Sequence, residues 1–409
     1  MAARPLEPFR LERYFAEHEF VAPRLLCCSD CEPLTLAELL AMAPPPLRAL
    51  YDALSLGYTE SRGHPALLEA IAALHGDVGA LRSASCAPVV LAPQEGVYLA
   101  MRALLAPGDR VVCTAPGYQS LSEVARAIGC SVVPWWAKGA GDAETDEPLF
   151  GFDVDALDAL LGVPGETKLL VVNFPHNPTG WTPTRAQWDA IVAKCARSGC
   201  FLFSDEMYRG LELRARGGVA LPSAVSLYAK AVVLCGVSKA LSLPGLRIGW
   251  LLSRDAAFLA RVCELKDFTT ICASAPSEIL ALIALARRDA IIARNRALIE
   301  ANLTALREFC AAHRDALRWR EPAAGTVTFV RLTRAVMQRR GWRDVDVFCA
   351  ELRAARGVLL LPASVYAAPP GAAPPPCFRL GFGRANFREC LAGLDAFLRD
   401  GGDGAGGAD

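Results

Sequence analysis

The feature that most constrains the fold is a set of short apolar runs separated by helical patterns. Residues 169–174 (LLVVNF), 201–204 and 231–235 are almost continuously apolar. Strands covered on both faces have this composition, whereas strands with one wet face alternate. The helical spacing of residues 66–75 and 188–198 places helices between such runs. The sequence therefore predicts an α/β fold with a mostly parallel central sheet sandwiched by helices.

A second unit follows the α/β block. Residues 291–399 begin with a long helical pattern and continue with short strands and helices, which predicts a smaller α+β domain. The large domain is expected over residues 51–290. Residues 1–50 have no partner within it and are expected to pack with the small domain. The Gly/Asp-rich residues 400–409 are expected to form a disordered tail.

Charge and hydropathy exclude several classes of function. The 409 residues include 43 Lys+Arg and 43 Asp+Glu, so the net charge is zero and no global field attracts nucleic acid. No apolar run approaches the roughly 18 residues of a membrane helix, and no signal-peptide core follows the N-terminus. We expect a soluble cytoplasmic protein that binds neither nucleic acid nor a membrane.

The cysteines do not form a disulfide framework, because their number, 15, is odd and they are scattered along a long chain. Most are expected to be small buried hydrophobes, as at Cys130, Cys195, Cys200 and Cys235. Cys27, Cys28 and Cys31 contain a C-x-x-C, but no second ligand pair follows at zinc-finger spacing. No metal is expected, although a metal or redox role for this cluster stays open.

Four short stretches occur in a particular order, at residues 173–180 (NFPHNPTG), 204–208 (SDEMY), 237–239 (VSK) and 245–249 (GLRIG). Each one alone is a weak signal, but each comes at or after the end of an apolar strand. In this order they resemble the class I/II aminotransferases, which are pyridoxal-phosphate enzymes of fold type I. The resemblance covers about residues 58–382. It implies that fold, a pyridoxal 5′-phosphate cofactor, and amino acid and 2-oxo acid substrates.

Lys239 and Asp205 carry the central chemistry in this resemblance. Apolar neighbours disfavour the charged form of a lysine relative to its neutral form, and the neutral amine is the form that condenses with an aldehyde. The resemblance implies that Lys239 forms the Schiff base and moves the proton between Cα and the cofactor. Asp205, at the end of a strand, would neutralise the protonated ring nitrogen. Without the other motifs, Asp205 and Glu206 would simply be a helix cap or loop acids.

Further residues are assigned to the cofactor by resemblance. Asn177 and Tyr208 would contact its O3′ atom, and Asn177 would also contact the substrate. Tyr118 would stack on the pyridine ring. Tyr58 is either a packing aromatic or a residue that reaches the cofactor phosphate of a neighbouring subunit, which would make the active form a homodimer.

The phosphate requires a fixed guanidinium and backbone donors at a helix start. Arg247 follows Lys239 by eight residues, the interval of the family, and Ser238 would add a hydroxyl. Gln94 and Glu95, at the start of a predicted helix, would supply backbone N–H groups. Two departures from the family weaken this site slightly. Gly236 stands where a hydroxyl residue is frequent, and Pro93 lacks one backbone donor.

Arg379, in CFRLGF, matches the arginine that pairs with the substrate α-carboxylate. Arg384 lies close by in the sequence and is the competing candidate. His176, beside Asn177, is expected to pack under the turn rather than to act in catalysis. Residues 28–32 (CSDCE), in the N-terminal loop where relatives contact the substrate, do not align clearly, so the side-chain pocket is not predicted.

The leading hypothesis is an aminotransferase that exchanges an amino group between an amino acid and a 2-oxo acid. A lyase or cyclase that eliminates or replaces a β or γ substituent would use the same residues and stays open. A ligand sensor on this fold is disfavoured, because no basic helix-turn-helix pattern precedes the α/β block. A nucleotide-binding protein is disfavoured because no glycine-rich phosphate motif follows a strand.

Overall fold

A computed structural model describes residues 4–76, 79–139, 146–213, 217–368 and 370–400. Within these ranges no helix has both the length and the apolar character needed to cross a bilayer. The predicted disordered tail lies outside the described residues, except for Asp400.

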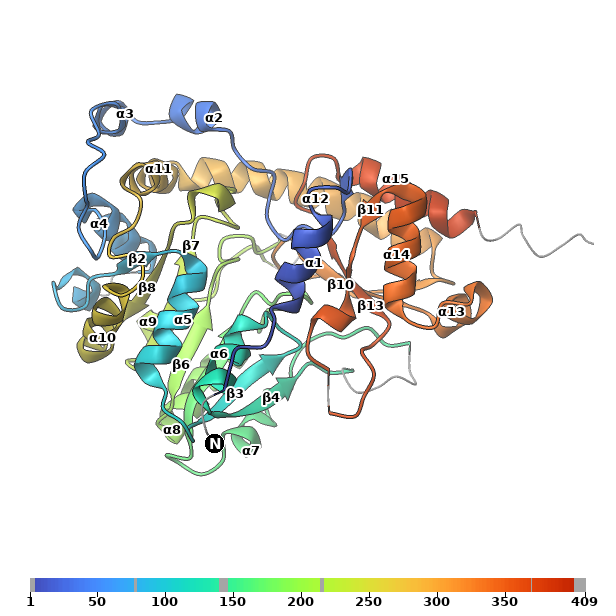
Figure 1. Ribbon diagram of the computed structural model, residues 1–409, viewed down its shortest axis with the longest axis horizontal. Coiled ribbons are helices and arrows are strands. Elements are labelled where there is room, and N and C mark those ends of the chain that lie inside the picture. The colour runs from blue at the N-terminus through green and yellow to red at the C-terminus, as the bar shows by residue number, and fades with distance from the viewer. Residues whose placement is uncertain (1–3, 77–78, 140–145, 214–216, 369, 401–409) are drawn as a thin grey trace, which may run out of the picture.

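The centre of the large unit is a seven-stranded sheet (Figure 1). Its strands, in spatial order, are β2 (Val89–Leu91), β8 (Gly249–Ser253), β7 (Ala231–Gly236), β6 (Phe201–Asp205), β5 (Thr167–Asn173), β3 (Arg110–Ala115) and β4 (Ser131–Trp136). The strands from β7 to β4 are parallel, and β8 runs antiparallel to both of its neighbours. The predicted mostly parallel sheet is confirmed.

Helices cover both faces of this sheet. Neighbouring residues of one strand enter different apolar clusters: Leu170 joins Trp188 and Ile191, while Leu169 joins Met101 and Leu259. The apolar runs are thus continuous because both faces are buried. The helices of this unit are α4 (Pro65–Leu74), α5 (Pro93–Leu104), α6 (Ser120–Ile128), α7 (Leu157–Leu161), α8 (Arg185–Ser198), α9 (Ala224–Leu227), α10 (Ala256–Lys266) and α11 (Ala275–Ala286), with 3-10 turns η1 (Gly79–Arg82) and η3 (Pro244–Leu246).

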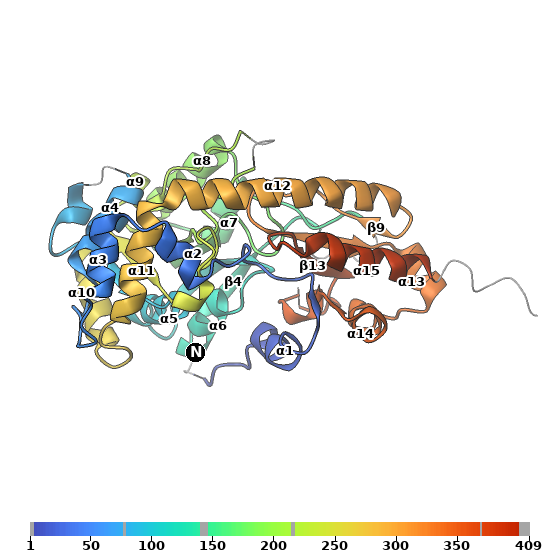
Figure 2. The same cartoon turned by 90° about the horizontal axis from the view of Figure 1, so that it is seen from above.

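The long helix α12 (Arg288–Ala312) runs from the large unit along the small one (Figure 2). The small unit contains an antiparallel sheet in the order β12 (Leu361–Pro362), β13 (Cys377–Gly381), β10 (Val327–Leu332) and β9 (Leu317–Arg318). Its other elements are α13 (Arg334–Arg340), α14 (Val345–Arg356), β11 (Val358–Leu359), η4 (Ala363–Val365) and α15 (Phe387–Arg399).

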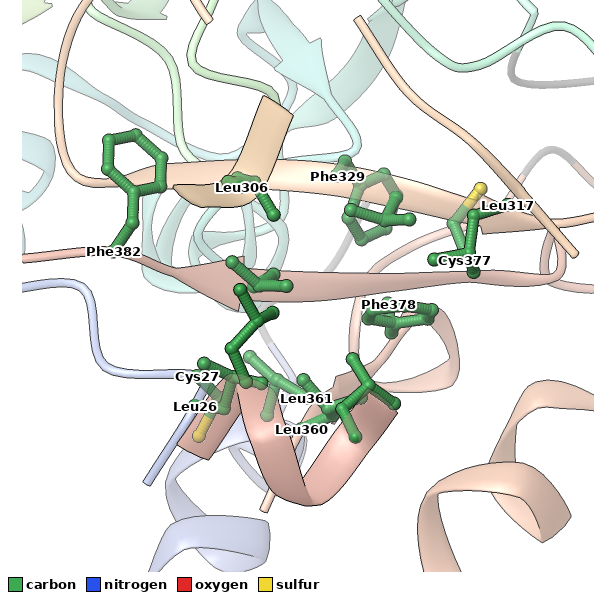
Figure 3. Close-up of a cluster of buried hydrophobic side chains, with 14 of the residues drawn as sticks. Leu26, Cys27, Leu306, Leu317, Phe329, Leu360, Leu361, Cys377, Phe378 and Phe382 are labelled. Atoms are coloured by element: carbon green, nitrogen blue, oxygen red, sulfur yellow. The ribbon is translucent and has the colours of Figure 1, made fainter. Parts of the chain in front are cut away.

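The first fifty residues, expected to pack with the small unit, divide between two partners. The helix α1 (Arg10–His18) contacts η4, and β1 (Arg24–Leu25) pairs in parallel with β11. Leu26 and Cys27 then lie beside Leu361 and Leu360 in the small-unit core (Figure 3). By contrast, α2 (Leu36–Ala41) and α3 (Pro45–Asp52) pack against α11 of the large unit. The chain therefore crosses between the units near residues 26–35.

Candidate active site

A cavity of about 400 Å³ lies where β5, β6 and β7 end. Open α/β sheets bind ligands at this edge. Nine of the residues predicted from the sequence line it: Gln94, Tyr118, Asn177, Asp205, Tyr208, Ser238, Lys239, Arg247 and Arg379. They come from both units, and α1 lines the cavity as well.

Lys239 follows β7 and extends its amine into the cavity. The amine donates a hydrogen bond to Ser29 Oγ at 2.8 Å. Burial lowers the pKa of Lys239 below its ordinary value. The neutral, nucleophilic form of the amine is therefore easier to reach than on an exposed lysine.

Asp205 is the last residue of β6, and its carboxylate is buried in the cavity wall. Oδ1 accepts the backbone N–H of Met207 at 3.0 Å. Burial raises the pKa of Asp205 to about 7. A buried carboxylate of this kind is stabilised by a cation placed next to it, such as a protonated ring nitrogen.

Glu206, the neighbouring acid, has a different environment. Its Oε1 accepts hydrogen bonds from the Ser223 hydroxyl at 3.1 Å and the Ala224 backbone N–H at 2.8 Å. It does not line the cavity. Glu206 therefore anchors the start of α9, and Asp205 alone of the pair faces the site.

Arg379, on β13, is a fully buried cation. Its guanidinium donates to the Asn177 side-chain oxygen at 3.1 Å, to the Tyr366 hydroxyl at 3.2 Å, and to the Cys27 carbonyl at 2.9 and 3.1 Å. No carboxylate among the described residues pairs with it. A buried cation held only by neutral acceptors favours an anionic ligand, such as an α-carboxylate.

Arg384, the competing candidate, is occupied elsewhere. It forms an ion pair with Asp30, with the closest contact at 2.9 Å, and it does not line the cavity. Its contribution is to hold the N-terminal segment near β13. The geometry thus favours Arg379 over Arg384 as the residue that meets a substrate carboxylate.

The region expected to hold a phosphate lies between η3 and the start of α5. Arg247 is exposed there and donates to the Pro244 carbonyl at 2.9 Å. Ser238 is buried, and its hydroxyl has no hydrogen-bond partner within the described chain. An unpaired buried hydroxyl beside a guanidinium and a helix N-terminus fits a phosphate group. The residues present therefore fit pyridoxal phosphate.

Two predicted cofactor residues have other surroundings. The Glu95 carboxylate caps its own helix by accepting the Ala92 N–H at 3.3 Å and also accepts the Thr270 hydroxyl at 2.8 Å, so only its backbone N–H could serve a ligand. Tyr58 is 92% exposed and lies outside the cavity of its own chain. An exposed tyrosine has no packing role within this chain.

The structure explains why a glycine stands at position 236 and what His176 does. A Cβ atom at Gly236 would lie 2.9 Å from both the Gly249 Cα and the Ile248 carbonyl oxygen, so β8 leaves no room there for a hydroxyl side chain. His176 is buried under the turn, where Nδ1 is 2.8 Å from the Thr179 hydroxyl and the ring contacts Phe152. Burial lowers the pKa of His176 to about 3, so it is a neutral packing group.

The sequence did not predict the N-terminal side of the cavity. Glu12, Phe15 and Glu19 of the α1 region line it, together with Ser29 and Asp30. The Glu12 carboxylate accepts the Tyr118 hydroxyl at 2.8 Å, which positions the aromatic ring expected to stack on the cofactor. These residues belong to no cofactor motif. The only signal was the polar string at residues 28–32.

Comparison with known proteins shows the family to which the chain belongs. Residues 48–392 match the family described as "Aminotransferase class I and II". The chain is 31% identical over 377 residues to capreomycidine synthase of Streptomyces vinaceus, which covers 90% of this chain and 87% of that protein. It is 30% identical over 217 residues to the arginine–pyruvate transaminase AruH of Pseudomonas aeruginosa, about half of each chain.

Among solved structures, the PLP-dependent cyclase OrfR superposes with a TM-score of 0.82 at 30% identity, covering 98% of this chain and 99% of that chain. The family match spans most of the sequence and both structural units. This chain therefore belongs to the class I and II aminotransferases, and it is a pyridoxal-phosphate-dependent enzyme of fold type I.

Proposed function

We propose that the cavity at the ends of β5, β6 and β7 is the active site of this enzyme, with Lys239 as the reacting amine. The observation that carries the proposal is the convergence of Lys239, Asp205 and Arg379 on one cavity. When bound, pyridoxal phosphate supplies an aldehyde that condenses with amines and a ring that accepts the electrons released at Cα. The chain supplies the remaining functions.

The role assigned to each residue combines its environment with the family resemblance. Arg379 and Asn177 bind and orient the substrate carboxylate. Asp205 holds a positive charge at the ring nitrogen, and Tyr208 donates from its phenol, whose pKa burial raises to about 12. The phosphate is held by Arg247, Ser238 and the backbone donors of Gln94 and Glu95. Tyr118 stacks on the ring, and Lys239 moves the proton at Cα.

The test is to reconstitute purified protein with pyridoxal phosphate, reduce it with borohydride and map the labelled peptide. We expect the label on Lys239, and no label in Lys239→Ala. Mixing the loaded enzyme with an amino acid and a 2-oxo acid should then yield the exchanged pair. A label on another lysine would overturn the assignment of the site.

The substrate class follows from the charge around the cavity. Arg247 and Asp205 are assigned to the cofactor, Arg379 to the substrate carboxylate, and Asp30 is paired with Arg384. The Glu12 and Glu19 carboxylates remain in the lining. Burial and the neighbouring Asp30 and Glu12 carboxylates raise the pKa of Glu19. A cation bound next to Glu19 would lower this pKa again and stabilise the carboxylate. We propose an amino donor with a cationic side chain, as the name of the arginine–pyruvate transaminase also suggests.

A screen of basic, neutral and acidic amino acids against a few 2-oxo acids tests this assignment. Arginine, lysine and ornithine should exceed norleucine in kcat/KM, and aspartate and glutamate should be the poorest donors because the lining carboxylates repel them. Preference for an acidic donor would contradict the proposed substrate class while leaving the aminotransferase activity intact.

A second candidate reaction keeps the cofactor and the residues. The relatives include a protein named capreomycidine synthase and a structure described as a PLP-dependent cyclase. A cyclase of this type would displace a substituent beyond Cα by a nucleophile of the same substrate. Incubation with a basic amino acid that carries a β-hydroxyl, without any 2-oxo acid, separates the two. Many turnovers would indicate cyclisation or elimination, and one turnover per subunit would indicate transamination.

We also propose that the enzyme works as a homodimer in the cytoplasm. Tyr58 is exposed in one chain, as is Leu56, and the resemblance implies that Tyr58 reaches a neighbouring phosphate site. All fifteen cysteines are unpaired, which suits a reducing compartment. Sedimentation of the loaded enzyme at twice the chain mass is the expected result.

A further inference from the structure

Ser29 contacts the reacting amine from outside every cofactor motif. Its hydroxyl accepts the Lys239 amine at 2.8 Å, across 210 residues of sequence. The same hydroxyl lies near the Tyr208 phenol, and its proximity acts against the effect of burial on the pKa of Tyr208. Ser29 therefore contacts the Lys239 amine and shares the cavity wall with the Tyr208 phenol.

The position of Ser29 is fixed by the strands of the small unit. Its carbonyl accepts the Thr326 hydroxyl at 2.7 Å, and the Glu32 N–H donates to the Gly383 carbonyl at 2.8 Å. Gly381 allows a close approach of the backbone, because a Cβ atom there would lie 1.9 Å from the Cys28 carbonyl oxygen. We define residues 26–32 as the strap, a segment held tightly against β13.

We propose that Ser29 is a positioning residue that orients the Lys239 amine while the amine is free in the cavity. This proposal rests on Lys239 being the reacting amine. When one N–H of the neutral amine donates to Ser29 Oγ, the rotation of the amine is restricted and its lone pair is directed into the cavity. Ser29 O–H can then donate to the Tyr208 oxygen, so each group in the chain Lys239–Ser29–Tyr208 has a partner. The amine is oriented without the loss of a proton from any of these three side chains.

The first experiment uses the cofactor-free protein, so it does not depend on activity. Lys239 is acetylated over a pH series, and labelling of its peptide is quantified by mass spectrometry in wild type, Ser29→Ala, Ser29→Thr and the exposed control Ser85→Ala. A hydrogen bond to the ammonium form raises an amine pKa. Ser29→Ala should therefore shift the Lys239 labelling midpoint to lower pH, and Ser29→Thr and Ser85→Ala should leave it in place.

The second experiment uses the loaded enzyme and measures a single half-reaction with an amino acid deuterated at Cα. We expect Ser29→Ala to slow this step by about 10- to 100-fold, because a Lys239 amine that is not oriented points less often at the Cα proton. The isotope effect should increase and KM should change little. Ser29→Thr should recover most of the rate.

The outcomes separate the two proposals. An unchanged labelling midpoint together with an unchanged half-reaction in Ser29→Ala overturns the role of Ser29, while the aminotransferase assignment stands. An increase in KM with an unchanged rate of the half-reaction would indicate that Ser29 contacts the substrate, and this result would also overturn the proposal. If borohydride labels a lysine other than Lys239, the proposed active site fails, and the labelling data still report whether Ser29 contacts Lys239.

Discussion

At the scale of single residues, the environment rather than the residue type separates structural from functional groups. Asp205 and Glu206 are adjacent, acidic and buried. Glu206 receives hydrogen bonds from Ser223 and Ala224, whereas Asp205 faces the cavity with one backbone donor from Met207. The sequence motif identified the pair, and the hydrogen bonds show which member is available for a ligand.

The pKa of Asp205 leads to a prediction about stability. Because this pKa is raised to about 7 in the folded chain and is about 3.9 in an unfolded one, the cofactor-free protein should lose stability as pH rises from about 4 to 7. Asp205→Asn cannot ionise. In calorimetry without cofactor at pH 8, it should be more stable than wild type by roughly 2–4 kcal/mol.

This advantage should disappear near pH 4, where wild-type Asp205 is protonated. The same variant should bind pyridoxal phosphate more weakly, because the ring nitrogen loses its counter-charge. A variant that is less stable than wild type at pH 8 would show that the carboxylate is not strained by burial.

Glu19 provides a second test at this scale. Glu19→Gln removes the negative charge and keeps the size of the side chain. The kcat/KM for lysine or arginine should therefore fall about tenfold, whereas the kcat/KM for norleucine should stay within about twofold of the wild-type value. The matched control is Glu17→Gln in the last turn of α1, just before Glu19, because the Glu17 side chain is 75% exposed and lies outside the cavity. Equal losses for basic and neutral donors would exclude recognition of a cation.

At the scale of elements, the apolar runs predicted the strands well. β5, β6 and β7 lie where the runs predicted them, because strands buried on both faces must be apolar throughout. The antiparallel direction of β8 could not be predicted, because a strand's residues do not encode which way its neighbour runs. α1 was also not predicted: its nine residues are amphipathic, but a pattern this short does not separate a helix from a loop by itself.

Close packing of β7 against β8 gives a prediction at this scale. Gly236→Ser should destabilise the protein by about 1–3 kcal/mol, because its Cβ would overlap the backbone of β8. Gly245→Ala is the matched control, since no atom lies within 4 Å of a Cβ built there. Urea unfolding measures both, and an unchanged midpoint for Gly236→Ser would show that β8 moves freely.

At the scale of the whole molecule, the proposed active site belongs to neither unit alone. Lys239 and Asp205 come from the large unit, Arg379 comes from β13, and Ser29 comes from the strap. α12 connects the two units along their length (Figure 2). Any change in how the units sit together should therefore change the distance between the Lys239 amine and the Arg379 guanidinium.

The proposed dimer gives the prediction at this scale. Tyr58→Phe should leave the thermal stability of the cofactor-free chain unchanged, because the side chain is exposed and packs on nothing in its own chain. It should weaken binding of pyridoxal phosphate about tenfold by removing one phosphate hydrogen bond. Tyr98→Phe on α5, which is 42% exposed, is the control. A monomeric loaded enzyme, or unchanged affinity in Tyr58→Phe, would contradict the shared site.

The sequence by itself determined the layered α/β fold, the family and the cofactor, because these depend on local patterns: apolar runs for buried strands, and short motifs at strand ends. Only the tertiary structure placed Arg379, and not Arg384, in the cavity wall, left Glu206 and the Glu95 side chain outside it, and brought Ser29 to Lys239. Those outcomes depend on contacts between residues far apart in the chain. The order of residues in a sequence carries no direct record of such distances, which are set when the two units and the strap pack together.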